Sequence, residues 1–160
     1  MTETVTVLMW AGALGCALVA GVFFAFSAFV MAGLRRLPDE QGLAAMRSIN
    51  VTAVTPAFMT AVFGSAAVVV ALAVIALTGG QEDWHAWVVA AAAVYVAGVV
   101  GMTAAFHVPR NNALATLDPR DAGAAAAWRR YDRVWTAGNH VRTVAALVAT
   151  ALLIGGLRAI

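Results

Sequence analysis

Long uncharged stretches alternate with short polar stretches along this chain. Three stretches without a charged side chain cover residues 4–34, 51–80 and 86–106. Each is longer than the roughly 20 residues that a helix needs to cross the hydrocarbon core of a bilayer. A fourth uncharged stretch, residues 143–157, is too short to cross alone, so its span must include polar residues that precede it. The pattern predicts an all-α fold, a four-transmembrane-helix bundle.

We expect residues 1–160 to form one integral membrane domain, with spans at about residues 5–34, 51–78, 86–107 and 138–157. The N-terminus has no basic side chain ahead of its long apolar run, which favours a span over a cleaved signal peptide. Between the first two spans, Pro38 and two acids open a segment in which Leu43, Met46 and Ile49 recur at three-residue spacing. This spacing predicts a short interfacial helix that ends near Asn50.

Three prolines help to place the helix ends. Pro56 lies just inside the second predicted span, where it is expected to kink the helix. Pro109 is expected to end the third span, since a proline disfavours helix at the preceding residue. Asp118 and Pro119 resemble an N-cap and first turn, which predicts a long helix from there through Trp128 into the fourth span.

Small residues recur every four positions in two of the predicted spans. Such stripes allow close approach of helices, either within the bundle or between copies of a homo-oligomer. The stripes are Ala17, Gly21 and Ala25 in the first span, and Ala93, Ala97, Gly101 and Ala105 in the third.

Composition and charge agree with a membrane protein. The chain is 62% hydrophobic and only 11% charged, whereas soluble domains are about 25% charged. The formal net charge is +2, and the arginines are spread over loops, so a nucleic-acid-binding function is not indicated. Most arginines follow the first and third spans, and only Arg158 lies on the opposite side. The positive-inside rule therefore predicts a plasma-membrane protein with those two loops in the cytoplasm and both termini outside.

A polar and aromatic string leads into the fourth apolar run. On a helical wheel, Trp128, Tyr131, Trp135, Asn139 and Arg142 fall within a sector of about 80°. His140 lies about 100° to the side of this sector. An aromatic belt followed by a snorkelling arginine is one interpretation. The shortness of the apolar run favours another, in which Asn139, His140 and Arg142 face protein or a cavity.

Further polar residues are expected at the same side of the membrane. These are His107, Asn111 and Asn112 at the end of the third span and Asn50 before the second. The two neighbouring asparagines could simply cap a helix end. Together with the string, the four residues could instead surround a pocket whose donors hold an oxyanion. Phenylalanines of the first span, Phe26 among them, could form its walls. Outside this pocket, Asp132 is expected to pair with Arg129 on its own helix.

At these residues the chain resembles the anthrone oxygenase-like family of small four-span membrane proteins. The matching segments are Phe24-Ala-Phe-Ser-Ala-Phe-Val-Met31, Ala45-Met46-Arg-Ser-Ile-Asn50, Pro56-Ala-Phe58-Met59, Val108-Pro109-Arg-Asn111-Asn112-x-Leu114 and Trp128-x2-Tyr131-x3-Trp135-x3-Asn139-His140-x-Arg142-Thr143. The family usually has asparagine before Val-Pro, and this chain has His107. If that position contacts substrate, the substrate should differ.

The resemblance implies oxidation of an anthrone-like hydrophobic aromatic to a quinone by O2, without an added cofactor. In that reading His140 is the base, since a histidine exchanges protons near neutral pH. Arg142, Asn139 and Asn50 would stabilise the oxyanion. The remaining expected substrate contacts are Asn111, Asn112, His107, Trp128 and the residues that would sandwich the rings, namely Trp135, Tyr131 and Phe26.

Two other functions remain open from the sequence. His107 and His140 could bind haem from both sides, or a quinone, in a membrane redox module. The chain could also be a non-catalytic membrane subunit or a small transporter, although the spans contain few central ionisable residues for transport. Two histidines without carboxylates make a poor zinc or di-iron site, so we expect no metal.

Overall fold

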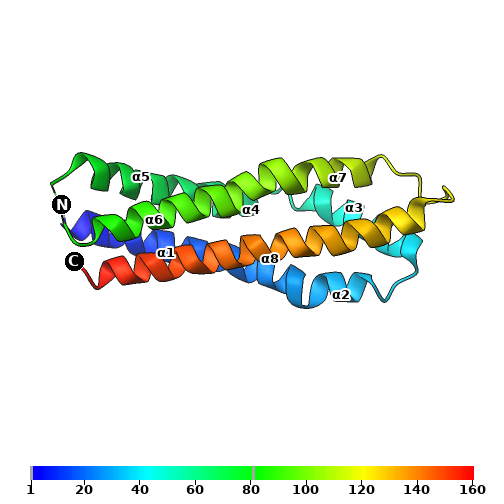
Figure 1. The fold of residues 1–160 in the computed structure, drawn as a ribbon, viewed down its shortest axis with the longest axis horizontal. Helices are drawn as coiled ribbons and strands as arrows, with labels where there is room; N and C mark the ends of the chain where they lie inside the picture. The colour runs from blue at the N-terminus through cyan, green and yellow to red at the C-terminus, as the bar shows by residue number, and fades with distance from the viewer. Residues whose placement is uncertain (1, 81) are drawn as a thin grey trace.

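The computed structural model describes residues 2–80 and 82–160, which form a four-helix bundle without any strand (Figure 1). Four helical spans are long and apolar enough to cross a membrane: Glu3–Leu34, Pro56–Thr78, His85–Ala115 and Ala124–Leu157. Both termini lie at one end of the bundle, beside the turn between the second and third spans. The other end, here called the loop end, carries the two remaining connections. The predicted all-α four-span bundle is confirmed.

The spans are built from shorter helical elements, several of them π-helical. The first comprises α1 (Thr2–Ala25), η1 (Phe26–Val30) and α2 (Met31–Leu34), and α3 (Asp39–Thr52) follows it. The second comprises α4 (Pro56–Met59), η2 (Thr60–Gly64) and α5 (Ser65–Thr78). The third comprises α6 (His85–Tyr95), η3 (Val96–Gly101), η4 (Thr103–His107) and α7 (Val108–Ala115). The fourth is one long helix, α8 (Ala124–Leu157).

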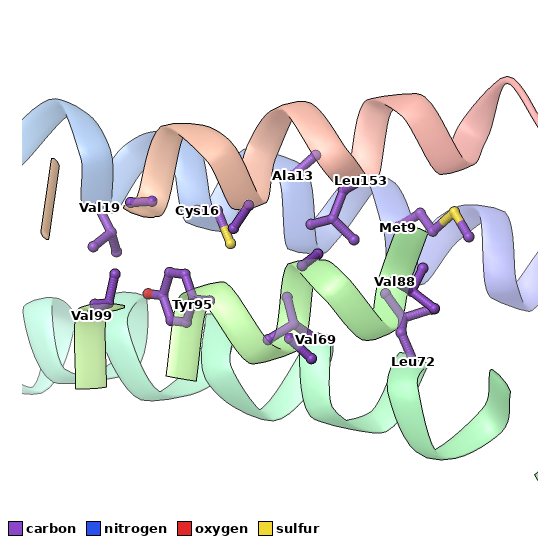
Figure 2. Packing of buried hydrophobic residues seen from close by; sticks show 14 of the residues in the cluster. Met9, Ala13, Cys16, Val19, Val69, Leu72, Val88, Tyr95, Val99 and Leu153 are labelled. Carbon is purple, nitrogen blue, oxygen red and sulfur yellow. The ribbon is translucent and has the colours of Figure 1, made fainter. Parts of the chain in front are cut away.

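The half of the bundle nearer the termini is held by an apolar core. Helix α1 packs against α5 and α8, and α6 packs against the same two helices (Figure 1). Cys16 is fully buried in this core, beside Val19 and the Tyr95 ring (Figure 2). The Tyr95 hydroxyl donates to the Val62 carbonyl at 3.1 Å, so its polar atom is satisfied inside the apolar layer.

The predicted small-residue stripes do not make the close contacts between helices of this chain. Ala93, Ala97 and Gly101 are exposed, and a side chain added at Gly21 would meet no atom within 4 Å. The buried face of the third span instead carries both small and large residues, namely Val88, Ala91, Ala92, Tyr95 and Val99, with Gly98 beside them. The stripes therefore lie on the outer surface, and self-association through them stays a prediction.

Gly98 is a position at which the third and fourth spans approach closely. A Cβ at Gly98 would lie 2.4 Å from the Ala145 Cβ, which has no flexible end to move aside. We expect Gly98→Ala to destabilise the bundle by about 1–3 kcal/mol, because the helices must separate. Gly21→Ala is the matched control and should be neutral or stabilising, since alanine favours helix. Thermal unfolding of both variants in one detergent measures the difference, and equal midpoints would contradict it.

A second core fills the loop end. Leu43 and Met46 of α3 are buried there against Leu114 of α7 and Trp128 of α8. The predicted short helix between the first two spans is therefore present, although it continues to Thr52.

The long helix before the fourth span begins later than predicted. The structure has turns at Asp118 and Pro119, and α8 starts at Ala124. The Asp118 side chain accepts from the Arg120 amide at 2.9 Å, so it stabilises a turn and caps no helix.

Two proline predictions are wrong for opposite reasons. Pro56 does not kink the second span but begins it, with the Thr55 side chain accepting from the Phe58 amide at 3.3 Å. Pro109 does not end the third span, because the helix continues to Ala115. The π-helical turns of η4 come directly before it, and such wide turns relieve the clash of a proline ring with the preceding turn.

The expected ion pair within α8 does not form. The buried Asp132 carboxylate accepts two hydrogen bonds from Arg35, each 3.1 Å long, and Arg129 pairs with Asp39 of α3. Both acids thus bind arginines of other elements. These pairs fasten α8 to the connection between the first two spans at the loop end.

Candidate functional site

A cavity of about 240 Å³ lies inside the half of the bundle nearer the loop end. Residues of all four spans and of α3 line it, and most are aliphatic or aromatic. Its polar lining consists of Asn50, Thr103, Asn111 and Arg142. A largely apolar cavity with a few convergent polar groups is typical of a site for a small hydrophobic ligand.

Arg142 is the charged residue of the cavity. Its exposed fraction is 6%, and no carboxylate of the described residues pairs with it. One Nη atom donates to Thr103 Oγ1 at 3.3 Å and the other to Asn139 Oδ1 at 2.7 Å, while Nε has no partner. The guanidinium carbon also lies 4.2 Å from the centre of the Phe23 ring. Neutral groups and ring faces thus surround a buried positive charge, which costs free energy unless an anion completes the site.

Asn139 positions this arginine against the first span. It is fully buried, and its Nδ2 donates to the Phe23 carbonyl at 2.6 Å and to Ser27 Oγ at 2.8 Å. Its Oδ1 is left to accept from Arg142. Phe23 lies near the end of α1, and Ser27 belongs to the π-helical element η1 that follows. Asn139 therefore does not line the cavity itself but holds the residue that does.

A second group of hydrogen bonds joins α3, α7 and α8. Asn111 Oδ1 accepts from the Tyr131 hydroxyl at 2.8 Å and from Trp135 Nε1 at 3.0 Å. Asn50 Nδ2 donates to the same hydroxyl at 3.4 Å. Asn111 thus orients two aromatic residues and does not cap a helix end, since α7 continues past it. Asn112 is exposed and does not line the cavity.

The aromatic residues of the string form a column along α8. The rings of Trp128 and Tyr131 are stacked with centroids 5.9 Å apart, and those of Tyr131 and Trp135 follow at 6.4 Å. Only Trp135 of these three reaches the cavity, where it meets Phe26 at 5.7 Å. Tyr131 does not line the cavity, and Trp128 is buried in the core of the loop end. Phe26 and Trp135 thus contact each other at an interplanar angle of 52° and form one wall of the cavity, so the predicted sandwich of the substrate rings stays a prediction and Tyr131 has no part in this wall.

His107 is buried directly behind this wall. Its ring meets the Trp135 ring edge to face with centroids 5.1 Å apart, and its exposed fraction is 1%. Nδ1 lies 3.1 Å from the Met102 carbonyl, which can only accept, so Nδ1 carries a proton. Nε2 is buried without a hydrogen-bond partner. His107 does not line the cavity, so direct contact with a ligand there has no support.

His140 lies on the outer face of α8. It is exposed and does not line the cavity, so the prediction that it faces protein or a cavity is wrong. A catalytic base must come within hydrogen-bond reach of the proton that it removes. The exposed position gives His140 no such reach into the cavity. It also leaves the haem alternative without support, since His107 is buried and His140 is not.

Sequence reasoning missed Thr103, whose hydroxyl accepts from Arg142 and donates to the Val99 carbonyl at 2.7 Å. A single threonine in an apolar run gives no signal of its own. Among the described residues, no group of three or more His, Cys, Asp or Glu side chains could hold a metal ion.

Comparison with known proteins finds one family. Residues 55–152 match the family described as anthrone oxygenase. No curated protein and no solved structure shows significant similarity to the chain. The match covers most of the chain, including the second and third spans and the string up to Arg142. This multi-pass membrane protein therefore belongs to the anthrone oxygenase family.

Proposed function

We propose that the protein binds a flat anthrone-like aromatic in the cavity and oxidises it with O2 to the quinone. The observation that carries this proposal is Arg142, a buried cation without a carboxylate partner at the wall of an aromatic and aliphatic cavity. An ionisable residue inside membrane spans is expensive and points to a function. A planar ligand with an acidic oxygen supplies both the apolar surface and the missing negative charge.

The chemistry begins with loss of a proton from the anthrone methylene. The electron pair delocalises onto the carbonyl oxygen across the ring, and this oxyanion lies against the Arg142 guanidinium. Phe26 and Trp135, whose rings contact each other, form an aromatic wall against which the ligand rings pack. Because the charge develops where a fixed cation already stands, deprotonation becomes easier in a site with little water.

The anthrolate then reacts with O2 at the former methylene carbon. One electron passes to O2, and the two radicals combine to form a carbon–oxygen bond and a hydroperoxide. Loss of the second proton from that carbon breaks the O–O bond, and hydroxide leaves as water after protonation. One anthrone and one O2 thus give one anthraquinone and one water. The aromatic supplies all the electrons, so no cofactor is needed.

In this proposal catalysis rests on anion stabilisation. No carboxylate or imidazole of the described residues lines the cavity, whose polar groups are amides, a hydroxyl and the guanidinium. We therefore assign the released protons to water held inside the cavity beside these polar groups, and not to His140. Asn50 and Asn111 are the amides within reach of ring substituents.

We also propose that the loop end faces the cytoplasm. Arg35, Arg47 and Arg129 belong to elements at that end, whereas Arg158 follows α8 at the other. This distribution satisfies the positive-inside rule for a plasma-membrane protein with both termini outside.

Oxygen consumption by the detergent-purified protein tests the proposed function. An anthrone in the presence of the protein should consume O2 and form quinone in equal amounts, faster than in a protein-free blank that measures spontaneous oxidation. With ¹⁸O2 the quinone should gain one labelled oxygen, and the second labelled atom should leave as water. A rate equal to the blank would reject the proposal.

A further inference from the structure

We propose that the cavity opens sideways between the second and third spans, and that a lipophilic aromatic ligand enters it from the hydrocarbon phase of the bilayer. The ligand class rests on the proposed function, whereas the opening rests on the packing of the described helices. The occupant to which we commit is a flat, uncharged aromatic dissolved in the membrane.

The second and third spans pack closely toward the termini, whereas at the loop end the third span packs against α3, which precedes the second span. Toward the termini, α5 packs along α6, and at the loop end α3 packs against α7. Between these contacts, α4 and η2 make little backbone contact with η4, although residues 56–64 and 103–107 are all described. The cavity occupies this interval, lined by Met59 and Phe63 on one side and Thr103 and Val108 on the other.

Three residues of the cavity wall are also exposed on the outside of the bundle. The exposed fractions are 54% for Phe63, 43% for Val108 and 70% for Val54. A side chain that lines a cavity and is exposed at the same time marks its mouth. Val54 lies in the break between α3 and α4, so the mouth extends toward the loop end.

The chemistry of this rim fits lipid better than water. All three rim residues are apolar, and they belong to or directly adjoin segments that are long and apolar enough to span a membrane. A mouth that takes ligand from water is expected to carry polar groups, whereas here the polar groups lie inside, at Arg142 and Asn111. A hydrophobic ligand concentrates in the bilayer, so a lateral mouth receives it at a higher concentration than an aqueous one.

Binding kinetics in vesicles test the opening without any turnover. The probe is 9,10-anthraquinone in phosphatidylcholine vesicles that contain the protein, followed by quenching of tryptophan fluorescence in a stopped-flow instrument. Trp135 lines the cavity, so the part of the fluorescence quenching that is absent in Trp135→Phe reports probe binding in the cavity. Val108→Phe narrows the mouth, and we expect it to slow association and dissociation together by about tenfold. Phe63→Ala widens the mouth and should speed both.

Val96→Phe is the matched control. Val96 lies on the same span with 39% exposure and does not line the cavity, so both rates should equal those of the unaltered protein. Adding protein-free vesicles at constant total probe should slow association, because it dilutes the probe within the lipid. Equal rates in Val108→Phe and Val96→Phe would overturn the inference, as would rates that follow only the aqueous probe concentration.

These results separate the opening from the oxidation. If Val108→Phe and Phe63→Ala change the binding rates as expected but the protein does not oxidise an anthrone, the lateral opening is supported and the proposed function is rejected. If the protein oxidises an anthrone but Val108→Phe binds the probe at unchanged rates, the proposed function is supported and the lateral opening is rejected. Absence of any probe binding overturns the opening.

Discussion

Replacing Arg142 with methionine is expected to lower the turnover number for an anthrone by about 10²- to 10³-fold. The guanidinium is the cation at the cavity wall; within residues 2–80 and 82–160 it has no carboxylate partner, and its Nε atom has no hydrogen-bond partner. Methionine fills a similar volume but leaves the developing oxyanion without a positive partner. Steady-state O2 uptake, corrected for spontaneous oxidation, measures this loss.

The same substitution should leave the fold intact or stabilise it. Burying a cation without an anion costs free energy, and replacement of buried charged groups by apolar residues is often neutral or stabilising. We therefore expect the thermal unfolding midpoint of Arg142→Met to equal or exceed that of the unaltered protein. A substitution that lowers activity but not stability identifies a residue retained for function, because replacing a structural residue would lower both.

Arg142→Lys separates charge from shape. Lysine retains the positive charge but cannot present a planar fork toward Thr103 and Asn139 at once. An intermediate turnover number is expected, above that of Arg142→Met. Turnover by Arg142→Met at the rate of the unaltered protein would remove the arginine from the mechanism.

The helical wheel, together with the chemistry of the residues on it, predicted the inner face of α8. The five residues placed in one sector, Trp128, Tyr131, Trp135, Asn139 and Arg142, are all buried, with exposed fractions of 8% or less. Their chemistry made the prediction possible, because aromatic and polar residues at helical spacing do not suit a lipid-facing surface. The same wheel placed His140 to the side of this sector. The shortness of the fourth apolar run and the chemistry of histidine as a base led to its assignment to the site.

Other features could not be read from the sequence because they depend on partners in other spans. The continuation of the third span through Pro109 depends on π-helical turns, which leave no spacing signal in an apolar run. The close approach at Gly98 depends on the small Ala145 opposite it, whereas the regular alanine stripe faces outward. Thr103 becomes part of the site only because Arg142 of another span reaches it. Apolar runs thus predict spans well, but the faces of uniformly apolar helices are decided by packing.

Asn139→Ala is expected to lower the turnover number by about 10²-fold. Displacing a catalytic group by about 1 Å has an effect of this size. Asn139 does not line the cavity, and its effect passes through Arg142. Its Oδ1 accepts a hydrogen bond from an Arg142 Nη atom at 2.7 Å. Unlike Arg142→Met, this change should also destabilise the bundle by about 1–3 kcal/mol, because the buried Phe23 carbonyl loses its side-chain donor. Thr143→Val is the matched control: it removes a buried hydroxyl that donates to the Asn139 carbonyl within α8 and should leave turnover unchanged.

Non-additivity distinguishes a positioning residue from a merely structural one. If Asn139 acts by orienting Arg142, then adding Asn139→Ala to Arg142→Met removes nothing further, and the double variant should turn over at the rate of Arg142→Met alone. If Asn139 only holds the first span against α8, its loss should reduce turnover by the same factor in both backgrounds. The first result requires that the 2.7 Å bond between the two side chains matters for the reaction. An equal loss in both backgrounds would show that Asn139 only holds α8 against the first span. A role in catalysis would then remain for Arg142 and the other residues that line the cavity.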